Sequence, residues 1–462
     1  MAATKISSSF TFSLYIFLSL LSLASAFSPA DHYLINCGSR ADETLDPDHR
    51  VFAGDHSRFA SSTRSIRLEN ADSDRGSYSP IYHTARAFNQ PLHYTFWTKD
   101  RATHHLVRLH FHPLRNECNN LFEAEFHVVA NGFVLLRTFR ISENDSFPVI
   151  KEFVIPVVSE KVEIRFIPSN KWKFGFVNAI EVISAPQDLI ADVAQLVDSE
   201  RNERIDGLLK NGFETVHRVN VGGFKVTPFN DSLWRTWVTD DEYLKSDDGS
   251  EKIHFGGQIK YKSGGASREV GPDNVYNTAR VIKSLNGSVP NMNITWTFQV
   301  EKGYRYMVRM HFCDIASAAT NMLYFNVYVN GNLAYENLDL SGITYGLLAS
   351  PFYADFVVNG ENSGVLAVSV GPSNTSLPRA VDAILNGVEI WKMNNFMGSF
   401  DGEVCADSIL RSWKRARIDV LLPLVGAVVL LITASMLMLR RRNVSVGWSR
   451  LPTDVSEANL KG

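Results

Sequence analysis

This sequence has few cysteines, a small net charge and few long segments with helical periodicity. Only four cysteines occur in 462 residues, and no two have the spacing of about two to four residues that is typical of a zinc site. The formal net charge is −3, so the composition does not indicate nucleic-acid binding. Apolar residues rarely follow helical spacing over long stretches, which argues against a helical fold and favours β-structure.

One short motif occurs twice in the chain. It is IYHTAR from Ile81 and VYNTAR from Val275, 194 positions later. The two copies are followed in the same order by VRLHF and VRMHF, VVANG and VYVNG, IPSN and GPSN, and NAIEV and NGVEIW. Their openings, LINCGS and RVNVGG, also correspond. Such a repeat predicts two copies of one domain, each of roughly 160 to 180 residues, a size at which a single hydrophobic core is normal.

Each copy contains short runs in which apolar and polar residues alternate, as they do in half-buried antiparallel strands. Residues 121–129 (LFEAEFHVV) and 323–329 (LYFNVYV) are rich in aromatic and β-branched side chains, and Asn-Gly follows each run. Asn-Gly in this position is a hairpin turn signal. We therefore predict an all-β fold of two tandem β-sandwich (jelly-roll-like) domains.

The predicted domains occupy residues 27–185 and 213–394, with a connector at 186–212 and an extracellular juxtamembrane segment at 395–419. In the connector, Leu189, Val193, Leu196 and Val197 lie at helical spacing among charged residues. This spacing predicts a short helix between the two domains.

The two ends of the chain indicate export and a membrane anchor. Residues 1–26 carry Lys5, an apolar run at 10–23 and a small-residue cleavage site ending at Ala26, as a secretory signal peptide does. Residues 420–439 contain no charge and would form about 30 Å of helix, enough to cross a bilayer. Arginines at 440–442 place the tail, 440–462, in the cytoplasm. We expect a single-pass type I protein of the plasma membrane with its N-terminal ectodomain outside.

Sequons and cysteines fit this topology. Five Asn-x-Ser/Thr sequons precede the predicted span, at Asn144, Asn230, Asn286, Asn293 and Asn374. The cysteines on the exported side, where disulfides persist, are Cys37, Cys118, Cys313 and Cys405. Four cysteines allow three pairings, and the sequence does not choose among them.

The repeated segments, together with NDSLWRTWVTDD at 230–241, resemble the tandem malectin-like ectodomain of plant receptor kinases of the FERONIA and THESEUS kind. The resemblance covers almost the whole chain after the signal peptide. The last residues, GWSRLPTDVSEANLKG, are similar to the juxtamembrane stretch that precedes the kinase in that family. The resemblance implies a secreted peptide of the rapid alkalinization factor type as ligand and a GPI-anchored co-receptor as partner. No cofactor is expected.

Enzymatic activity is not expected from the chain as given. The glycine-rich, V-A-I-K, H-R-D and D-F-G motifs of a kinase do not occur in residues 440–462, a segment too short to bury a core. The chain is therefore expected to be a kinase-less receptor-like protein or part of a longer receptor kinase. A glycosidase would need two carboxylates about 5 to 10 Å apart across a cleft. The acidic segment at 239–251 is interpreted instead as a solvated loop.

The repeated motif has two interpretations, one as a binding site and one as scaffold. In the sugar-binding domain that names the family, aromatic residues around the corresponding motif line a disaccharide site, although Ala85 and Ala279 stand where that motif has glutamate. By this resemblance, the candidate ligand-binding residues are Tyr82 and Tyr276, which match the tyrosine of that motif. The flanking aromatics Phe88, Tyr94 and Trp97 are further candidates, which we expect to lie on unrepeated loops and to stack on a sugar ring. In the preferred structural interpretation, the motif pins a loop in each domain through Tyr82, Arg86, Tyr276 and Arg280.

Four histidines, at 104, 105, 110 and 112, lie close together in the sequence, and His110 and His112 would share one face of a strand. That spacing suits two metal ligands, but the second copy keeps only His311 and has Cys313 in place of His112. Ordinary hydrogen-bonded histidines and no metal are therefore preferred.

Two classes of function remain. The first is a plant cell-surface receptor-like protein whose ectodomain binds a secreted peptide, cell-wall carbohydrate or both, and signals through partners or through a kinase domain absent from this chain. The second is a tether that binds pectin or another cell-wall glycan, or a ligand decoy, without signalling.

Overall fold

The computed structural model describes residues 28–445 except 56–58, 62–64, 71–77, 100–102, 117–118, 144–146, 200–201, 247–248, 263, 284–291, 361–362 and 377–380. The predicted signal peptide and most of the predicted tail lie outside the described residues. The chain divides into two compact units, Met1–Ala406 and Asp407–Gly462. The first unit contains both predicted domains.

The first domain is a β-sandwich built around a core of aromatic and aliphatic side chains. One layer contains, in sheet order, β13 (Val149–Val157), β8 (Thr103–Phe111), β16 (Ala179–Ser184), β1 (His32–Asn36), β3 (Val51–Gly54) and β2 (Glu43–Leu45). The facing layer contains a sheet of β12 (Phe133–Phe139), β11 (Phe126–Ala130), β14 (Lys161–Pro168), β7 (Leu92–Trp97) and β4 (Ala60–Ser61), and a sheet of β15 (Gly175–Val177), β6 (Thr84–Phe88) and β5 (Ser65–Glu69).

The second domain repeats this arrangement around a core of its own. One layer contains β27 (Pro351–Asn359), β24 (Arg305–Cys313), β30 (Gly387–Met393) and β19 (Phe213–Asn220). The facing layer contains β23 (Ile294–Gln299), β28 (Val365–Pro372), β25 (Tyr324–Val329) and β26 (Asn332–Asp339), beside β21 (Ser250–His254), β22 (Thr278–Lys283) and β29 (Val381–Leu385). The order β27-β24-β30-β19 matches β13-β8-β16-β1, so the repeat in the sequence is a repeat in the fold.

Short elements complete the two domains. They are η2 (Pro80–Tyr82), β9 (Arg115–Asn116), β10 (Asn119–Asn120), η3 (Leu121–Glu123), η4 (Leu208–Lys210), η5 (Pro228–Asn230), β20 (Val238–Thr239), α2 (Asp273–Tyr276) and α3 (Leu340–Ile343). In each domain the repeated motif begins in a short helix, η2 or α2, and runs into the strand that follows, β6 or β22.

Both predicted hairpins are confirmed. The turn between β11 and β12 has positive φ at Asn131 (45°) and Gly132 (91°), and the turn between β25 and β26 has positive φ at Asn330 (50°) and Gly331 (77°). Two consecutive residues with positive φ are characteristic of the type I′ turn, whose twist matches that of the paired strands.

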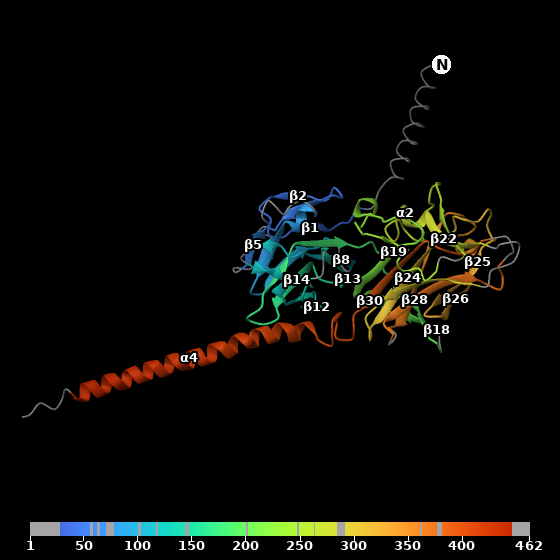
Figure 1. The fold of residues 1–462 in the computed structure, drawn as a ribbon. Helices are drawn as coiled ribbons and strands as arrows, with labels where there is room; N and C mark the ends of the chain where they lie inside the picture. Colours follow the sequence, from blue (N-terminus) through green and yellow to red (C-terminus); the bar gives the residue numbers. More distant parts are fainter. Residues whose placement is uncertain are drawn as a thin grey trace, which may run out of the picture. The chain divides into compact units, whose positions relative to one another are not determined.

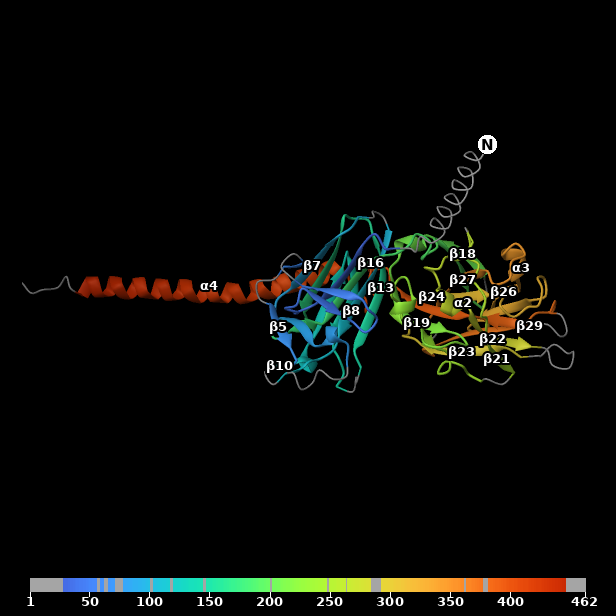
Figure 2. The same cartoon turned by 90° about the horizontal axis from the view of Figure 1, so that it is seen from above.

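The two sandwiches share one sheet. β13 of the first domain pairs with β19 of the second at Phe153↔Glu214 and Val154↔Phe213, and this pairing joins the strands into a 13-stranded sheet. Figures 1 and 2 show the first domain in blue to teal and most of the second in yellow to orange, with β13 and β19 between them. The two domains are therefore connected by backbone hydrogen bonds as well as by the connector.

The connector residues that lie at helical spacing do not form the predicted helix, so that prediction is wrong; helical structure in the described connector is confined to the single turn η4. Connector residues form a hairpin of β17 (Val193–Val197) and β18 (Asn202–Asp206), and β17 adds to the second domain by pairing in parallel with β27. Apolar residues four apart fit a helix, but they also fit a strand in which they share one face. Here the pairing of β17 with β27 favours the strand.

The segment after β30, residues 394–405, returns to the first domain; we call it the return segment. The Val134 amide donates to the Gly398 carbonyl (2.9 Å), and the Phe400 amide donates to the Val134 carbonyl (3.0 Å). The Phe400 ring is fully buried in the first domain's core, 5.2 Å from the Phe153 ring and 6.3 Å from the Phe133 ring between centroids. The first part of the predicted juxtamembrane segment is therefore folded structure.

The second unit contains all but the first residue of α4 (Ala406–Ser445), which includes the predicted span at 420–439. Among the described residues, no helix combines the length and the apolar character that crossing a membrane would require.

Candidate functional site

The repeated motif of the first domain is buried and bonded within that domain. The Tyr82 hydroxyl lies 2.9 Å from His110 Nδ1, and His110 Nε2 lies 3.0 Å from Glu181. Arg86 donates from Nε and Nη2 to the two carboxylate oxygens of Asp55, at 2.5 and 2.6 Å. The motif arginine therefore neutralises a carboxylate that is almost completely buried.

The second copy makes equivalent contacts. The Tyr276 hydroxyl lies 2.9 Å from His311 Nδ1, and His311 Nε2 lies 3.2 Å from Glu389. Arg280 Nε donates to Asp240 Oδ2 at 2.6 Å, and Asp240 is fully buried. The acidic segment at 239–251 is thus not simply a solvated loop, because Asp240 is buried and accepts a hydrogen bond from Arg280.

The threonine and alanine of the motif are equally constrained. Thr84 donates to Asn36 Oδ1 at 2.8 Å, and Thr278 donates to Asn220 Oδ1 at 2.9 Å. The motif alanine of the first copy packs against Gly38, where an added Cβ would lie 2.2 Å from the alanine carbonyl oxygen. Each residue type in the motif therefore has a structural partner, as the structural interpretation predicts.

A chain of buried ion pairs connects the two copies across the domain interface. Arg108 donates to Glu181 at 2.6 Å and to Glu152, and Arg218 donates to Glu152 and to Glu389, each at 2.6 Å. Burial alone would raise the pKa of Glu152, but the two arginines outweigh burial and hold that pKa well below its ordinary value. At Glu389, Arg218 and His311 similarly overcome burial and lower the pKa to about 2.

Two of the predicted sugar-stacking aromatics do not lie on exposed loops. Phe88 and Tyr94 belong to β6 and β7 and are 2% and 0% exposed, so the prediction that they are loop residues is wrong. The alternation along β7 directs Tyr94 into the core, where its hydroxyl donates to Asp55 at 2.9 Å. Trp97, at the end of β7, is 63% exposed.

Two of the four histidines of the predicted cluster make ordinary polar contacts. His110 bonds Tyr82 and Glu181 as described, and His105 Nε2 lies 3.3 Å from Asp31. Burial lowers the pKa of His104 to about 4, and the charge of His105 contributes. The described residues contain no group of three or more side chains that could hold a metal ion.

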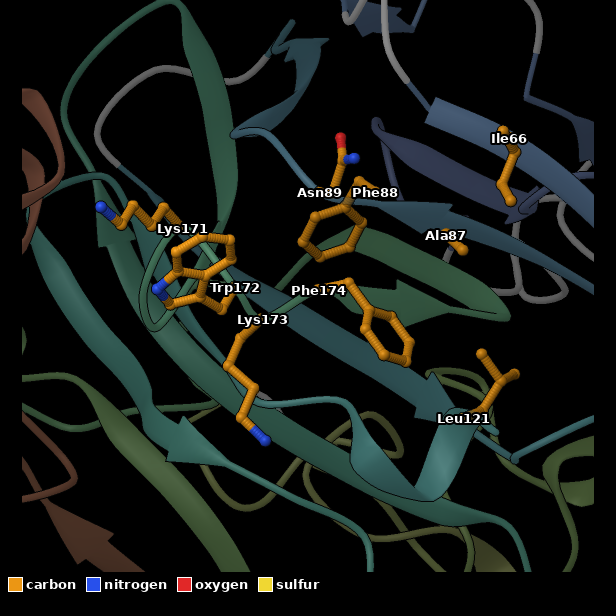
Figure 3. Close-up of a pocket in the computed structure, with 9 residues that line it drawn as sticks. All are labelled: Ile66, Ala87, Phe88, Asn89, Leu121, Lys171, Trp172, Lys173 and Phe174. Atoms are coloured by element: carbon orange, nitrogen blue, oxygen red, sulfur yellow. The ribbon is translucent and has the colours of Figure 1, made fainter. Parts of the chain in front are cut away.

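A pocket opens in the first domain, with a volume of about 370 Å³, and Phe88 is the one candidate residue from the sequence among those that line it. Figure 3 shows the rings of Phe88, Trp172 and Phe174 in it, with Lys171 and Lys173 on either side of Trp172 along the loop. Trp172 is 83% exposed, and Lys171 Nζ lies 5.1 Å from the centroid of its ring. The pocket is lined by Ile66, Ala87, Phe88, Asn89, Leu121, Lys171, Trp172, Lys173 and Phe174.

One sequence signal could have located this pocket. The segment Lys171-Trp172-Lys173 follows IPSN of the first copy, whereas TSLP follows GPSN of the second. A feature present in only one of two otherwise matched loops is more informative about function than the shared motif, because loops tolerate variation and carry binding residues.

Two further cavities, of about 270 and 410 Å³, adjoin at the domain interface and share the lining residues Ile150, Thr215 and Val216. We call them together the interdomain groove. The first is lined by the buried ion pairs around Glu152, and the second by Lys151, Glu214, Glu301 and Lys392.

Three sequons are exposed in the structure, and two lie outside the described residues. The exposed ones are Asn230, Asn293 and Asn374, and the others are Asn144 and Asn286. Cys37 and Cys313 are buried thiols without a disulfide, and burial raises the pKa of both. Cys118 lies outside the described residues.

A family comparison agrees with these observations. The Malectin-like domain family matches residues 35–393, which include nearly all strands of both sandwiches. The chain belongs to the malectin-like family. A probable receptor-like protein kinase from Arabidopsis thaliana is 44% identical over 389 residues and 82% of this chain, and the receptor-like protein kinase THESEUS 1 from the same plant is 39% identical over 412 residues and 87% of it. The malectin-like chain spans about half of these relatives, 46% and 47% of their lengths.

A solved structure of the plant peptide RALF23 in complex with FER and LLG2 contains a chain similar to this malectin-like protein. The match has a TM-score of 0.69 at 31% identity and covers 82% of this chain and 99% of that chain. The resemblance to receptor kinases of the FERONIA and THESEUS kind is therefore confirmed, and so is the tandem malectin-like fold.

Proposed function

We propose that this chain forms the ectodomain of a plant cell-surface receptor-like protein that binds a secreted peptide together with a membrane-anchored co-receptor. The observation that supports this most directly is the match to 99% of the chain found in complex with RALF23 and LLG2. Any signal would pass through partners or through a kinase domain that this chain does not contain.

Binding of RALF23 to the purified full chain, measured with and without LLG2, tests the proposal. We expect saturable binding that strengthens when LLG2 is present, and no binding of a peptide of scrambled sequence. A FER ectodomain measured in parallel verifies that peptide and co-receptor are active. If FER binds and this chain does not bind RALF23 with or without LLG2, the proposed peptide function is wrong.

The pocket beside Trp172 supports a second function, binding of an acidic cell-wall glycan such as pectin. An exposed indole offers an apolar face to a sugar ring, and the ammonium groups of Lys171 and Lys173 suit carboxylates. We expect Trp172→Ala to weaken oligogalacturonide binding about tenfold, about 1.4 kcal/mol, without lowering the melting temperature. Trp97→Ala is the matched control, because Trp97 is an exposed tryptophan of the same domain outside the pocket.

These two variants also distinguish binding in the pocket at Trp172 from binding at Trp97, the exposed candidate residue from the sequence. If Trp97→Ala loses binding and Trp172→Ala does not, the glycan site lies at Trp97 and the pocket assignment is wrong. If both variants bind oligogalacturonide like the wild type, the carbohydrate function has no support from either tryptophan.

We further propose that the chain is a single-pass type I glycoprotein of the plasma membrane. The uncharged run at 420–439, the apolar side chains exposed along α4 and the three exposed sequons support this topology. Carbonate extraction of membranes, combined with enzymatic deglycosylation, tests it. Release of the chain into the soluble fraction, or an unchanged gel mobility after deglycosylation, would count against it.

A further inference from the structure

The strands that join the two domains pair over only part of their length. β13 pairs with β8 along all nine of its residues, but its other edge pairs with β19 only at Phe153 and Val154. The corresponding edge of β19 pairs with β13 at Phe213 and Glu214 and with β20 at Val219 and Asn220. In the described part of the chain, no strand pairs with residues 149–152 of β13 or 215–218 of β19 on these facing edges.

An irregularity in β19 marks the place where the two strands part. The register between β19 and β30 shifts between Thr215 and His217, so Val216 is an extra residue in its strand. Such a bulge bends the strand that carries it and increases its local twist. The bulge lies at Val216, one of the three residues that line both cavities of the interdomain groove.

The depth of the opening is limited by two side-chain contacts. Thr215 donates to Glu152 Oε1 at 2.7 Å and so connects β13 to β19 at the base of the groove. The side chain of Arg218, three residues further along β19, donates to the same oxygen at 2.6 Å. Beyond this point, the residues that face each other along the edges are 149–151 and 216–218. Three residues of strand span about 10 Å.

The charged groups of the groove already have partners. Glu152 is shared by Arg108 and Arg218, while Lys151 bonds Glu214 at 3.0 Å. Lys392 bonds Glu214 and Glu301. A small charged ligand would have to replace these ion pairs.

The groove instead presents unpaired backbone groups and apolar side chains to a ligand. Strand edges without a neighbouring strand present amide and carbonyl groups that another strand can pair with. Ile150 is 51% exposed at the opening, and Val216 is half-buried. This combination suits an extended polypeptide, because main-chain hydrogen bonds supply the affinity when a peptide adds to a sheet and pockets for its side chains supply the specificity.

We propose that the interdomain groove binds an extended segment of a secreted peptide as an added strand between residues 149–151 of β13 and 216–218 of β19. Apolar side chains of the peptide pack against Ile150 and Val216. The proposal rests on the peptide function proposed above and assigns its site. Because the two edges belong to different domains, the bound segment connects both sandwiches.

The test compares two aspartate variants of the full chain, with RALF23 and LLG2 as the probe. Ile150→Asp puts a charge at the opening of the groove, and Val158→Asp puts one on an 87% exposed valine next to the other end of β13. We expect Ile150→Asp to weaken RALF23 binding at least tenfold and Val158→Asp to leave it unchanged. Because both side chains are largely exposed, both variants should keep the wild-type melting temperature.

Amide hydrogen exchange gives a second, independent measurement. In the wild type, RALF23 should slow exchange at residues 149–151 and 216–218. If RALF23 binds but exchange there is unchanged and Ile150→Asp binds like Val158→Asp, the groove is not the site, and the peptide function stands without it. If the wild type does not bind RALF23 while FER does, the peptide function and this site are both wrong.

Discussion

Removing the Phe400 ring should release the return segment from the first domain. Phe400→Ala deletes a fully buried ring that contacts Phe133 and Phe153 in the core. Replacing a buried Phe with Ala costs about 3 to 5 kcal/mol, because transfer free energy is lost and a cavity remains. Since the rest of the first domain can stay folded, we expect this cost to appear first as detachment of residues 394–405.

Hydrogen exchange at the Phe400 amide measures that detachment directly, because this amide donates to the Val134 carbonyl in the docked state. Each 1.4 kcal/mol corresponds to a factor of ten, so a cost of about 3 to 5 kcal/mol should make the variant exchange about two to three and a half orders of magnitude faster than the wild type. The melting temperature of the chain should fall as well, because the cavity weakens the core.

Phe396→Ala is the matched control, since Phe396 lies in the same segment and is 86% exposed. A surface substitution of this kind is expected to change stability by no more than about 0.5 kcal/mol. If the two variants exchange at the same rate at residue 400, the buried ring does not hold the segment and the argument is refuted.

Two further predictions concern the scaffold. Arg86→Ala and Arg280→Ala should each destabilise the full chain by about 3 to 5 kcal/mol in chemical denaturation, because Asp55 and Asp240 lose their charged partner while buried. If both variants unfold like the wild type yet lose RALF23 binding, the motif is a binding motif and the structural interpretation is wrong. The second prediction concerns pH: the pKa of His104 is about 4 in the fold, below the ordinary value of about 6.5, so the unfolded chain takes up the proton first and stability should fall as pH drops from about 6.5 to 4. A melting temperature that depends on pH equally in the wild type and in His104→Gln would contradict it.

Local signals in the sequence predicted much of the fold. The Asn-Gly pairs at 131–132 and 330–331 predicted two hairpins, because the turn depends on only two residues and their φ angles. The tandem arrangement followed from the repeated segments, which lie at equivalent places in the two sheets. Both kinds of information are contained in short stretches of chain.

Features that depend on distant partners were not predictable in this way. Val193 and Val197 fit helical spacing, but the edge of β27 was available and the segment became a strand. The pairing of β13 with β19 and the insertion of Phe400 into the first domain leave no periodic pattern in the sequence.

The residues of the candidate site also fall into those that the sequence indicated and those that it did not. The repetition of Arg86 with its neighbours led to the structural interpretation, and the contact of Arg86 with the buried Asp55 agrees with it. The positions of Phe88 and Tyr94 were not inferred correctly, although the alternation Leu92, Tyr94, Phe96 already places Tyr94 on the buried face of β7. Trp172 was missed because the matching loop of the second copy has no aromatic residue at this place, so the comparison of the two copies did not point to it.

Because of the return segment, the folded structure extends beyond the end of the second repeat. A fragment that ended at residue 394 would include every strand of both sandwiches, yet it would leave a phenylalanine-sized hole in the first of them. The first domain alone, residues 27–185, would lack the same ring and the partner of the Val134 backbone. The sequence contains two copies of one unit, but the core of the first copy includes Phe400. During synthesis, the first domain can therefore be completed only after the whole of the second has been translated.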